Sequence, residues 1–206
     1  EGFFYSSYDK PKGSELSEMT DQHKLYYHKL GTPQSEDELI FGGTEEEKHR
    51  YVGASVTEDG RYLFVSASKT TSGNVSFLKD LDRPNSPLAA VDEDYSTDSY
   101  LLESEGPTFF IVTNKEAPNQ KLVKATAKHP NEQYWTDVIP ETENVLSVSS
   151  GGGYFFARYM IDAITKVVQY NFKGKNIRQV DLPGVGTARG WNGKMEQKNL
   201  DYSFTH

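Results

Sequence analysis

Four short strands rich in aromatic residues recur along the chain at a nearly constant spacing, and this repeat constrains the fold most strongly. They read Gly-Phe-Phe-Tyr-Ser from residue 2, Tyr-Leu-Phe-Val-Ser from 62, Thr-Phe-Phe-Ile-Val from 108 and Tyr-Phe-Phe-Ala-Arg from 154. A weaker copy, Leu-Asp-Tyr-Ser-Phe, begins at residue 200. The steps between Phe3, Tyr62, Phe109, Tyr154 and Leu200 are 59, 47, 45 and 46 residues. Repeats of this length that hold several short strands are typical of β-propeller blades.

The segments between these marker strands supply the other strands that a blade needs. One strand is expected before each of the three inner marker strands, at 51–56, 98–102 and 145–149. Two strands are expected after each of them: 75–81 and 88–91 after the first, 121–126 and 135–139 after the second, and 166–170 and 177–182 after the third. Four turns with glycine precede marker strands, where a tight hairpin needs positive φ: Asp59-Gly60, Glu105-Gly106, Gly151-Gly152-Gly153 and Asn192-Gly193. Helical periodicity is absent, and residues 160–165 are expected to form one helical turn at most. The sequence therefore predicts an all-β fold, a partial β-propeller of about four to five four-stranded antiparallel blades.

The strand count also predicts the domain organisation. Residues 1–206 are expected to form one partial propeller domain, with a polar loop insertion over residues 9–23 lengthening the first step. It would hold an incomplete blade at 1–43, blades at about 50–92, 93–140 and 144–183, and the start of a further blade at 184–206. The chain reads as an excerpt of a longer protein, and its open blade edges favour self-association.

Composition argues against several classes of partner. A net charge of -8 without a basic cluster argues against nucleic acid. No apolar run reaches the roughly 18 residues that a membrane helix needs, so no membrane partner is expected. The chain has no cysteine, which fits a reducing compartment. We expect a cytoplasmic protein, with the periplasm as the alternative.

Motifs for catalysis and for cofactor binding are missing. No G-x-S-x-G string is present, and the five histidines lack the spacing of a metal site and are interpreted as surface residues. The segment 184–190, Gly-Val-Gly-Thr-Ala-Arg-Gly, has its third glycine one position late for a dinucleotide loop. No cofactor, no metal and no catalytic residue is predicted. The paired phenylalanines are interpreted chiefly as core residues, because neighbouring blades cover both faces of most propeller sheets.

One stretch resembles a known family. Lys24-Leu25-Tyr26-Tyr27-His28-Lys29-Leu30-Gly31-Thr32, followed by Gln34-Ser35-Glu36-Asp37, closely resembles a strand and turn in the propeller of prolyl oligopeptidases. Further matches follow in the family's order: Gly2-Phe3-Phe4-Tyr5, Asp59-Gly60-Arg61-Tyr62, Thr113-Asn114-Lys115, Ile139-Pro140-Glu141 and Tyr202-Ser203-Phe204-Thr205. The resemblance covers essentially the whole chain.

The resemblance implies a serine peptidase that cleaves oligopeptides after proline. In that family a seven-bladed propeller caps an α/β-hydrolase domain and admits only short peptides. This chain matches propeller blades only, so it is expected to be inactive alone and to work with the hydrolase domain of its parent protein. A proline-containing oligopeptide is the implied substrate.

The resemblance also implies one substrate contact. The family places a propeller phenylalanine beside the substrate, and by this alignment it corresponds to Phe4, or to Phe3 if the alignment slips by one residue. Packing within the blade is an equally good interpretation of either ring. The alternative function is a stand-alone propeller-like domain that binds a protein or ligand without an enzymatic role.

Overall fold

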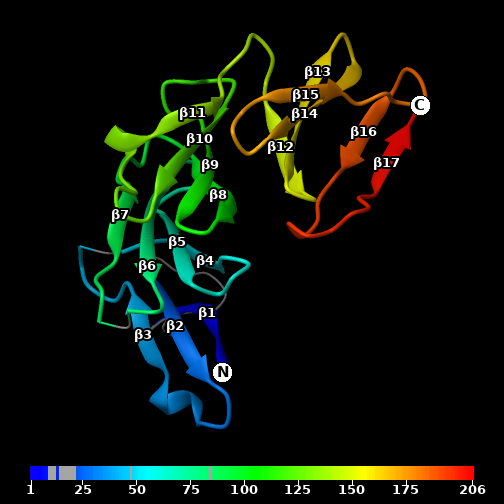
Figure 1. The fold of residues 1–206 in the computed structure, drawn as a ribbon. Helices are drawn as coiled ribbons and strands as arrows, with labels where there is room; N and C mark the ends of the chain where they lie inside the picture. The colour runs from blue at the N-terminus through cyan, green and yellow to red at the C-terminus, as the bar shows by residue number, and fades with distance from the viewer. Residues whose placement is uncertain (9–12, 14–21, 47, 84) are drawn as a thin grey trace. The chain divides into compact units, whose positions relative to one another are not determined.

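The protein is described here by a computed structural model that covers residues 1–8, 13, 22–46, 48–83 and 85–206. These residues form seventeen strands in five antiparallel sheets, with two short 3-10 turns (Figure 1). Within each sheet the strands follow one another in chain order from one edge to the other, as propeller blades do. The all-β prediction is therefore confirmed. No helix within the described ranges is long and apolar enough to cross a membrane.

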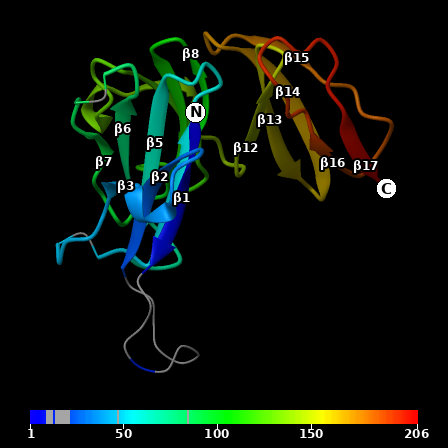
Figure 2. The same ribbon diagram turned by 90° about the horizontal axis from the view of Figure 1, so that it is seen from below.

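The chain divides into two compact units, Glu1–Asp98 and Ser99–His206. The first unit holds sheet I, with strand order β1-β2-β3, and sheet II, with strand order β4-β5-β6-β7 (Figure 2). Sheet I consists of β1 (Gly2–Tyr8), β2 (His23–Lys29) and β3 (Glu38–Phe41), with the 3-10 turn η1 (Gln34–Glu36) between the last two. Sheet II consists of β4 (Tyr51–Val56), β5 (Tyr62–Ser68), β6 (Val75–Asp80) and β7 (Ala89–Asp92).

The second unit holds sheets III, IV and V. Sheet III consists of β8 (Ser99–Glu105), β9 (Thr108–Thr113), β10 (Lys121–Thr126) and β11 (Thr136–Ile139), with the 3-10 turn η2 (Glu132–Tyr134) before β11. Sheet IV consists of β12 (Ser147–Gly151), β13 (Tyr154–Ile161), β14 (Ile164–Asn171) and β15 (Asn176–Gln179). Sheet V consists of β16 (Thr187–Gly190) and β17 (Tyr202–Thr205).

Apolar side chains between successive sheets form the cores. In the first unit, Leu25 and Phe41 of sheet I pack with Leu63 and Val65 of sheet II. In the second unit, one core lies between sheets III and IV and another between sheets IV and V. Burying a side chain of this size stabilises a fold by roughly 1.5–3 kcal/mol.

The adjacent phenylalanines on β13 explain why the marker strands carry aromatic pairs. Phe155 faces sheet III, where its ring centre lies 4.8 Å from that of Phe110. Phe156 faces sheet V and packs with Ala188 and Trp191. Because successive side chains of a strand point to opposite faces, one pair supplies two cores. Phe109, Phe110, Phe155 and Phe156 are all buried, as the sequence predicts.

Three of the four predicted glycine turns adopt positive φ, at Gly60, Gly106 and the pair Gly152-Gly153. The fourth prediction is wrong: Gly193 does not adopt positive φ, and residues 191–201 form a long connection between β16 and β17. Residues 160–165, where the sequence allows one helical turn at most, form no helix. This segment is a hairpin in which β13 and β14 pair up to Ile161 and Ile164.

Candidate functional site

The two phenylalanines that the resemblance points to lie side by side on β1 and face opposite sides of sheet I. Phe4 is half-buried against the core of the first unit, and its ring centre lies 5.0 Å from that of Tyr27. Phe3 is 51% exposed, and its ring centre lies 5.0 Å from that of His28. Phe3 therefore offers open surface to a ligand, whereas Phe4 helps to pack its sheet. A substrate contact by either ring stays a prediction.

A polar cluster lies beside Phe3. The Tyr5 hydroxyl donates a hydrogen bond of 2.7 Å to one oxygen of Asp37, and Nδ1 of His28 lies 2.7 Å from the other oxygen. Gln34 Nε2 donates to the Tyr5 hydroxyl over 3.3 Å. The 3-10 turn η1 positions the carboxylate, because the Asp37 backbone N–H closes that turn by donating to the Gln34 carbonyl. Together with Phe3, these residues line a hollow of about 330 Å³.

The Asp37 side chain is only 2% exposed, and its environment favours the ionised form. Desolvation acts to raise the pKa of Asp37, but the hydrogen bonds from Tyr5 and His28 and the attraction to His28 outweigh it, so this pKa is lowered. The Gln34 amide acts to lower the pKa of Tyr5, but the hydrogen bond to Asp37, desolvation and the negative charge of Asp37 raise it. The carboxylate therefore links β1, β2 and the turn before β3.

One histidine contradicts the sequence interpretation. His49 was expected at the surface, but it is 2% exposed, and its Nε2 lies 2.6 Å from the Tyr95 hydroxyl. Its ring centre lies 5.3 Å from that of Phe41, and its carbonyl accepts from the His23 backbone N–H over 2.8 Å. The charged residues around it in sequence gave no sign of this burial, because the contact with Tyr95 spans 46 residues.

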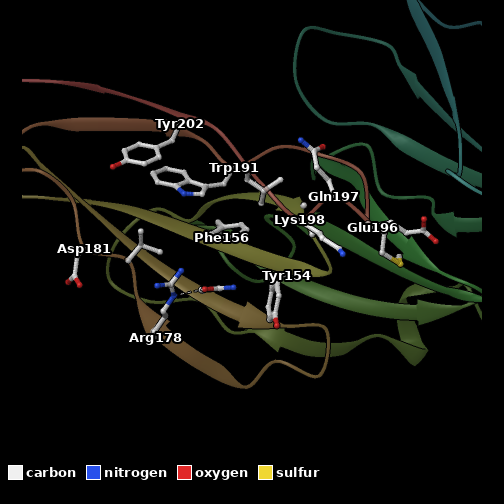
Figure 3. A pocket seen from close by; sticks show the side chains of 15 residues that line it. Tyr154, Phe156, Arg178, Asp181, Trp191, Glu196, Gln197, Lys198 and Tyr202 are labelled. Carbon is white, nitrogen blue, oxygen red and sulfur yellow. Dashed lines mark hydrogen bonds between the residues drawn. The ribbon is translucent and has the colours of Figure 1, made fainter.

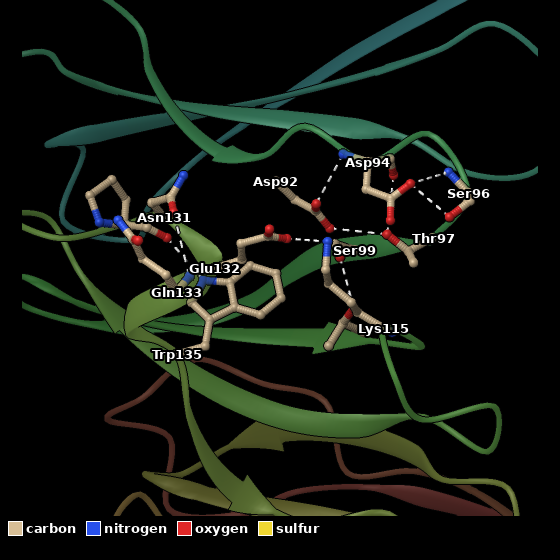
Figure 4. Close-up of polar contacts among 12 residues, drawn as sticks. Asp92, Asp94, Ser96, Thr97, Ser99, Lys115, Asn131, Glu132, Gln133 and Trp135 are labelled. Carbon is tan, nitrogen blue, oxygen red and sulfur yellow. Dashed lines mark hydrogen bonds and ion pairs between the residues drawn. The ribbon is translucent and has the colours of Figure 1, made fainter.

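The segment 92–98 between β7 and β8 has the acidic sequence Asp-Glu-Asp-Tyr-Ser-Thr-Asp, and its first and third residues accept hydrogen bonds within the turn (Figure 4). Asp92 accepts from the Asp94 backbone N–H and from the Thr97 hydroxyl. Asp94 accepts from both the N–H and the hydroxyl of Ser96. Among the residues that the structure describes, no three His, Cys, Asp or Glu side chains are grouped to hold a metal ion. These carboxylates therefore act as turn formers.

A second polar hollow lies on sheet III, in the second unit. It has a volume of about 270 Å³. The Trp135 indole N–H donates to the Pro130 carbonyl over 2.9 Å, and the Lys115 ammonium forms an ion pair with Glu132 (Figure 4). Lys121 pairs with Asp137 over 3.7 Å. Each charged side chain named here is already paired within the protein, so the hollow offers a ligand little unsatisfied charge.

The hollow between sheets IV and V is larger, at about 630 Å³ (Figure 3). Its aromatic wall is a stack in which the Trp191 ring centre lies 4.7 Å from that of Tyr202 and 6.1 Å from that of Phe156. Opposite the stack, Arg178 Nε donates to the Gln169 side chain over 2.8 Å. The hollow lies between sheet IV, which has four strands, and sheet V, which has two. We therefore interpret it as an inter-blade surface and not as a ligand site.

The glycine-rich segment 184–190 leads into a strand. Residues 187–190 form β16, and the Gly186 carbonyl accepts from the Thr165 backbone N–H over 3.0 Å. A dinucleotide loop instead requires a helix whose first N–H groups face the pyrophosphate. The rejection of a nucleotide loop is consistent with this geometry.

The cluster of Tyr5, His28 and Asp37 was not predicted from the sequence, although each of these residues lies in a segment that resembles the family. The signal was present in the motif that runs from His28 to Asp37, because an acid nine residues after a histidine can return to it through a turn. Only the strand register shows that Tyr5 of β1 lies opposite Tyr26, where its hydroxyl can reach the same carboxylate. Spacing along the chain cannot supply that register.

Comparisons with known proteins agree with this fold. The family model described as prolyl oligopeptidase, N-terminal beta-propeller domain, matches residues 1–206. A prolyl endopeptidase of Elizabethkingia meningoseptica is 50% identical over 207 residues, which cover 100% of this chain and 29% of that protein. Prolyl oligopeptidase A of Galerina marginata is 30% identical over 91% of this chain and 27% of its own length.

Solved structures show the same likeness in three dimensions. A chain from a structural and mechanistic analysis of two prolyl endopeptidases has a TM-score of 0.84 and 26% identity, covering 99% of this chain and 30% of its own. Prolyl oligopeptidase B of Galerina marginata, bound to a 25mer macrocyclization substrate, has a TM-score of 0.83 and 25% identity, covering 98% of this chain and 29% of its own. The chain thus spans less than a third of each relative. Because the family model matches every one of its residues, the chain belongs to the prolyl oligopeptidase family, in the N-terminal β-propeller domain.

Proposed function

We propose that this chain is the substrate-filtering propeller portion of a serine peptidase that cleaves oligopeptides after proline. The observation that carries the proposal is the 50% identity to a prolyl endopeptidase along the whole chain. Identity of this extent covers surfaces as well as cores.

The chemistry of the described site supports a role without catalysis. A serine peptidase needs a nucleophile, a histidine base and an oxyanion hole. None of the three hollows described above is lined by a serine, threonine or cysteine. We therefore place the nucleophile in an α/β-hydrolase domain of the parent protein, which is the proposed partner of this chain. Packed sheets can shield such a site from water and from bulky substrates.

The proposed substrate is a proline-containing oligopeptide. The Galerina marginata relative of similar fold was solved with a 25mer, which supports a peptide ligand for this fold. For the aromatic contact on β1, we propose that Phe3 is better placed than Phe4. Phe3 is half exposed, whereas Phe4 is already packed against Tyr27 and the core.

The test compares the full-length parent protein with the 206-residue chain, using a fluorogenic Gly-Pro peptide. We expect the parent to cleave it, a serine-directed covalent inhibitor to abolish the cleavage, and the chain alone to show none. We also expect the parent to cut a ten-residue peptide with an internal proline but to spare a folded protein. Cleavage by the chain alone, or no cleavage by the parent, would contradict the proposal.

A further inference from the structure

The hollow of about 330 Å³ beside Phe3 combines an aromatic ring with polar groups in one wall. Its lining residues are Phe3, Tyr5, His28, Gln34 and Asp37. The ring centre of Phe3 lies 5.0 Å from that of His28 and 6.1 Å from that of Tyr5. His28 and Tyr5 each contact a different oxygen of Asp37 over 2.7 Å. Direct contacts therefore join these side chains into one surface, within the first unit.

His28 supplies this surface with a hydrogen-bond acceptor. Against the cost of desolvation, the hydrogen bonds from Tyr5 and His28 lower the pKa of Asp37, so the carboxylate is ionised and can only accept. Nδ1 of His28 is therefore the donor to Asp37, and Nε2 carries the lone pair of the neutral ring. Nε2 has no hydrogen-bond partner among the residues that the structure describes, and the ring is partly exposed. The imidazole thus holds an acceptor in a fixed orientation.

Gln34 supplies a second acceptor. Its Nε2 donates to the Tyr5 hydroxyl over 3.3 Å, which leaves the amide oxygen as an acceptor. Gln34 is exposed, and within the described ranges this oxygen has no partner. The Tyr5 hydroxyl is already used, because it donates to Asp37 and accepts from Gln34. Apart from the second N–H of Gln34, the open hydrogen-bonding capacity of the hollow therefore consists of acceptors.

The charge around the hollow is negative. The Asp37 side chain is almost fully buried, so solvent screens its charge less than that of its exposed glutamate neighbours in sequence. No lysine or arginine in the described part of the chain forms an ion pair with Asp37. Lys29 follows His28 on β2 and therefore points to the opposite face of the sheet. Lys24 is on the same face as His28 but lies roughly 13 Å away along the strand.

An ammonium or guanidinium group suits all of these features. It donates hydrogen bonds to nitrogen and oxygen acceptors, and a carboxylate attracts it. It also binds the face of an aromatic ring, and Phe3 offers such a face because its side chain is half exposed. An anion would instead meet acceptors and a negative charge. An apolar group would cover the acceptors and leave them unpaired, which is costly.

We propose that Phe3, His28 and Gln34 form a receptor for a positively charged group of the peptide substrate. The inference rests on the proposed function and adds a substrate class, namely peptides that carry an ammonium or guanidinium group. The cation comes either from the N-terminus of the peptide or from a lysine or arginine side chain. Both sources present N–H donors and a full positive charge, so the experiment separates them.

The test uses the full-length parent protein and fluorogenic peptides with one fixed Gly-Pro cleavage site. In the first pair the N-terminus is either free or acetylated. In the second pair both peptides are acetylated, and one residue before the glycine is either lysine or norleucine. We expect the wild type to favour the cationic member of at least one pair by about tenfold in kcat/KM, which is about 1.4 kcal/mol. The preference should appear mainly in KM and should fall as salt rises.

Two variants of exposed side chains change the receptor in opposite directions. Phe3→Leu removes the aromatic face but keeps an apolar side chain, so it should fold normally and lower the ratio of cationic to neutral substrate about threefold. Gln34→Glu adds a negative charge at nearly the same size, so it should raise the ratio. The matched controls are Tyr134→Leu, at a ring that is also 51% exposed, and Gln133→Glu, at the exposed glutamine of turn η2. Both controls should keep the wild-type ratio.

Equal rates for both members of both pairs in the wild type would overturn the inference. A wild-type ratio in Phe3→Leu, or a ratio that does not rise in Gln34→Glu, would also overturn it. Failure of the proposed function gives a different result, namely no cleavage of any Gly-Pro peptide. In that case calorimetry of the full-length protein decides, using proline-free pentapeptides in the same two pairs. Tighter binding of a cationic member, weakened by Phe3→Leu, would support the receptor, and equal binding within both pairs would refute it.

Discussion

At the scale of single residues, paired aromatic side chains have different roles according to what covers each face of their sheet. Phe155 and Phe156 are both buried because sheet IV has a neighbour on either side. Phe3 and Phe4 belong to the same repeat, yet Phe3 is half exposed. The repeat therefore predicts the strand, but the neighbouring sheet determines which of its rings is core.

We predict that Phe155→Ala lowers the free energy of unfolding by about 3–5 kcal/mol, because its ring is fully buried and its removal leaves a cavity in the core. Phe3→Ala, at a half-exposed ring of the same repeat, should cost less than about 1 kcal/mol. Urea titration of the two variants, followed by tryptophan fluorescence, measures both. Similar losses in both would contradict the assigned burial.

The ionised Asp37 carboxylate should make stability depend on acid pH. Its folded pKa lies below the ordinary value of 3.8, so its contribution is fully present above that value and is lost as pH falls through the folded pKa. We expect the wild type to lose more stability between pH 5 and pH 2 than Asp37→Asn does.

The urea midpoint at each pH measures this difference. Asp181→Asn, at an exposed aspartate, should keep the wild-type pH profile. A profile for Asp37→Asn that runs parallel to that of the wild type would show that the carboxylate gains nothing from Tyr5 and His28.

At the scale of elements, turn chemistry accounts for both the correct and the wrong predictions. Glycine signals located the turns at Gly60 and Gly106. The turn between β13 and β14 escaped notice because it is made by Asp162 and Ala163, which adopt φ of 50° and 63°. An alanine rarely adopts this left-handed region, so no glycine signal in the sequence marked this turn. The eight-residue pairing of β13 with β14 overrides that local preference.

This strain predicts a stabilising substitution. Ala163→Gly should raise the free energy of unfolding by about 1 kcal/mol, because glycine adopts positive φ without a steric cost. Gly106→Ala is the matched control of opposite sign, since φ is 55° there and an added Cβ would meet no atom within 4 Å. Thermal denaturation should therefore show one midpoint above the wild type and one below. A lower midpoint for Ala163→Gly would contradict the strain.

At the scale of the whole molecule, the chain is a series of sheets, and its terminal sheets have fewer strands than the others. Sheet I has three strands and sheet V has two, whereas sheets II, III and IV have four. Among the described residues, strands β1 and β17 each have one edge without a partner strand, and such an edge is a template for another strand. The comparisons support the same view, because the chain spans 29% of its Elizabethkingia relative.

We predict that the 206-residue chain, produced alone, associates with itself through these edges. Sedimentation analysis should show species larger than a monomer at micromolar concentration, and high salt should not dissolve them, because strand pairing is not an ionic contact. The full-length parent is the control, and it should form assemblies with fewer copies than the 206-residue chain does. A chain that stays monomeric across that range would refute the prediction.

The sequence by itself determined the strands and their number per sheet, because adjacent aromatic residues and glycine turns are local signals repeated at a fixed period. The motif over residues 24–37 determined the family. The compartment stays a prediction. Only the tertiary structure decided the burial of His49 and the formation of the cluster at Asp37. Each of these depends on strand register or on a contact between sheets, and the free energy of such contacts comes from residues that local sequence does not place together.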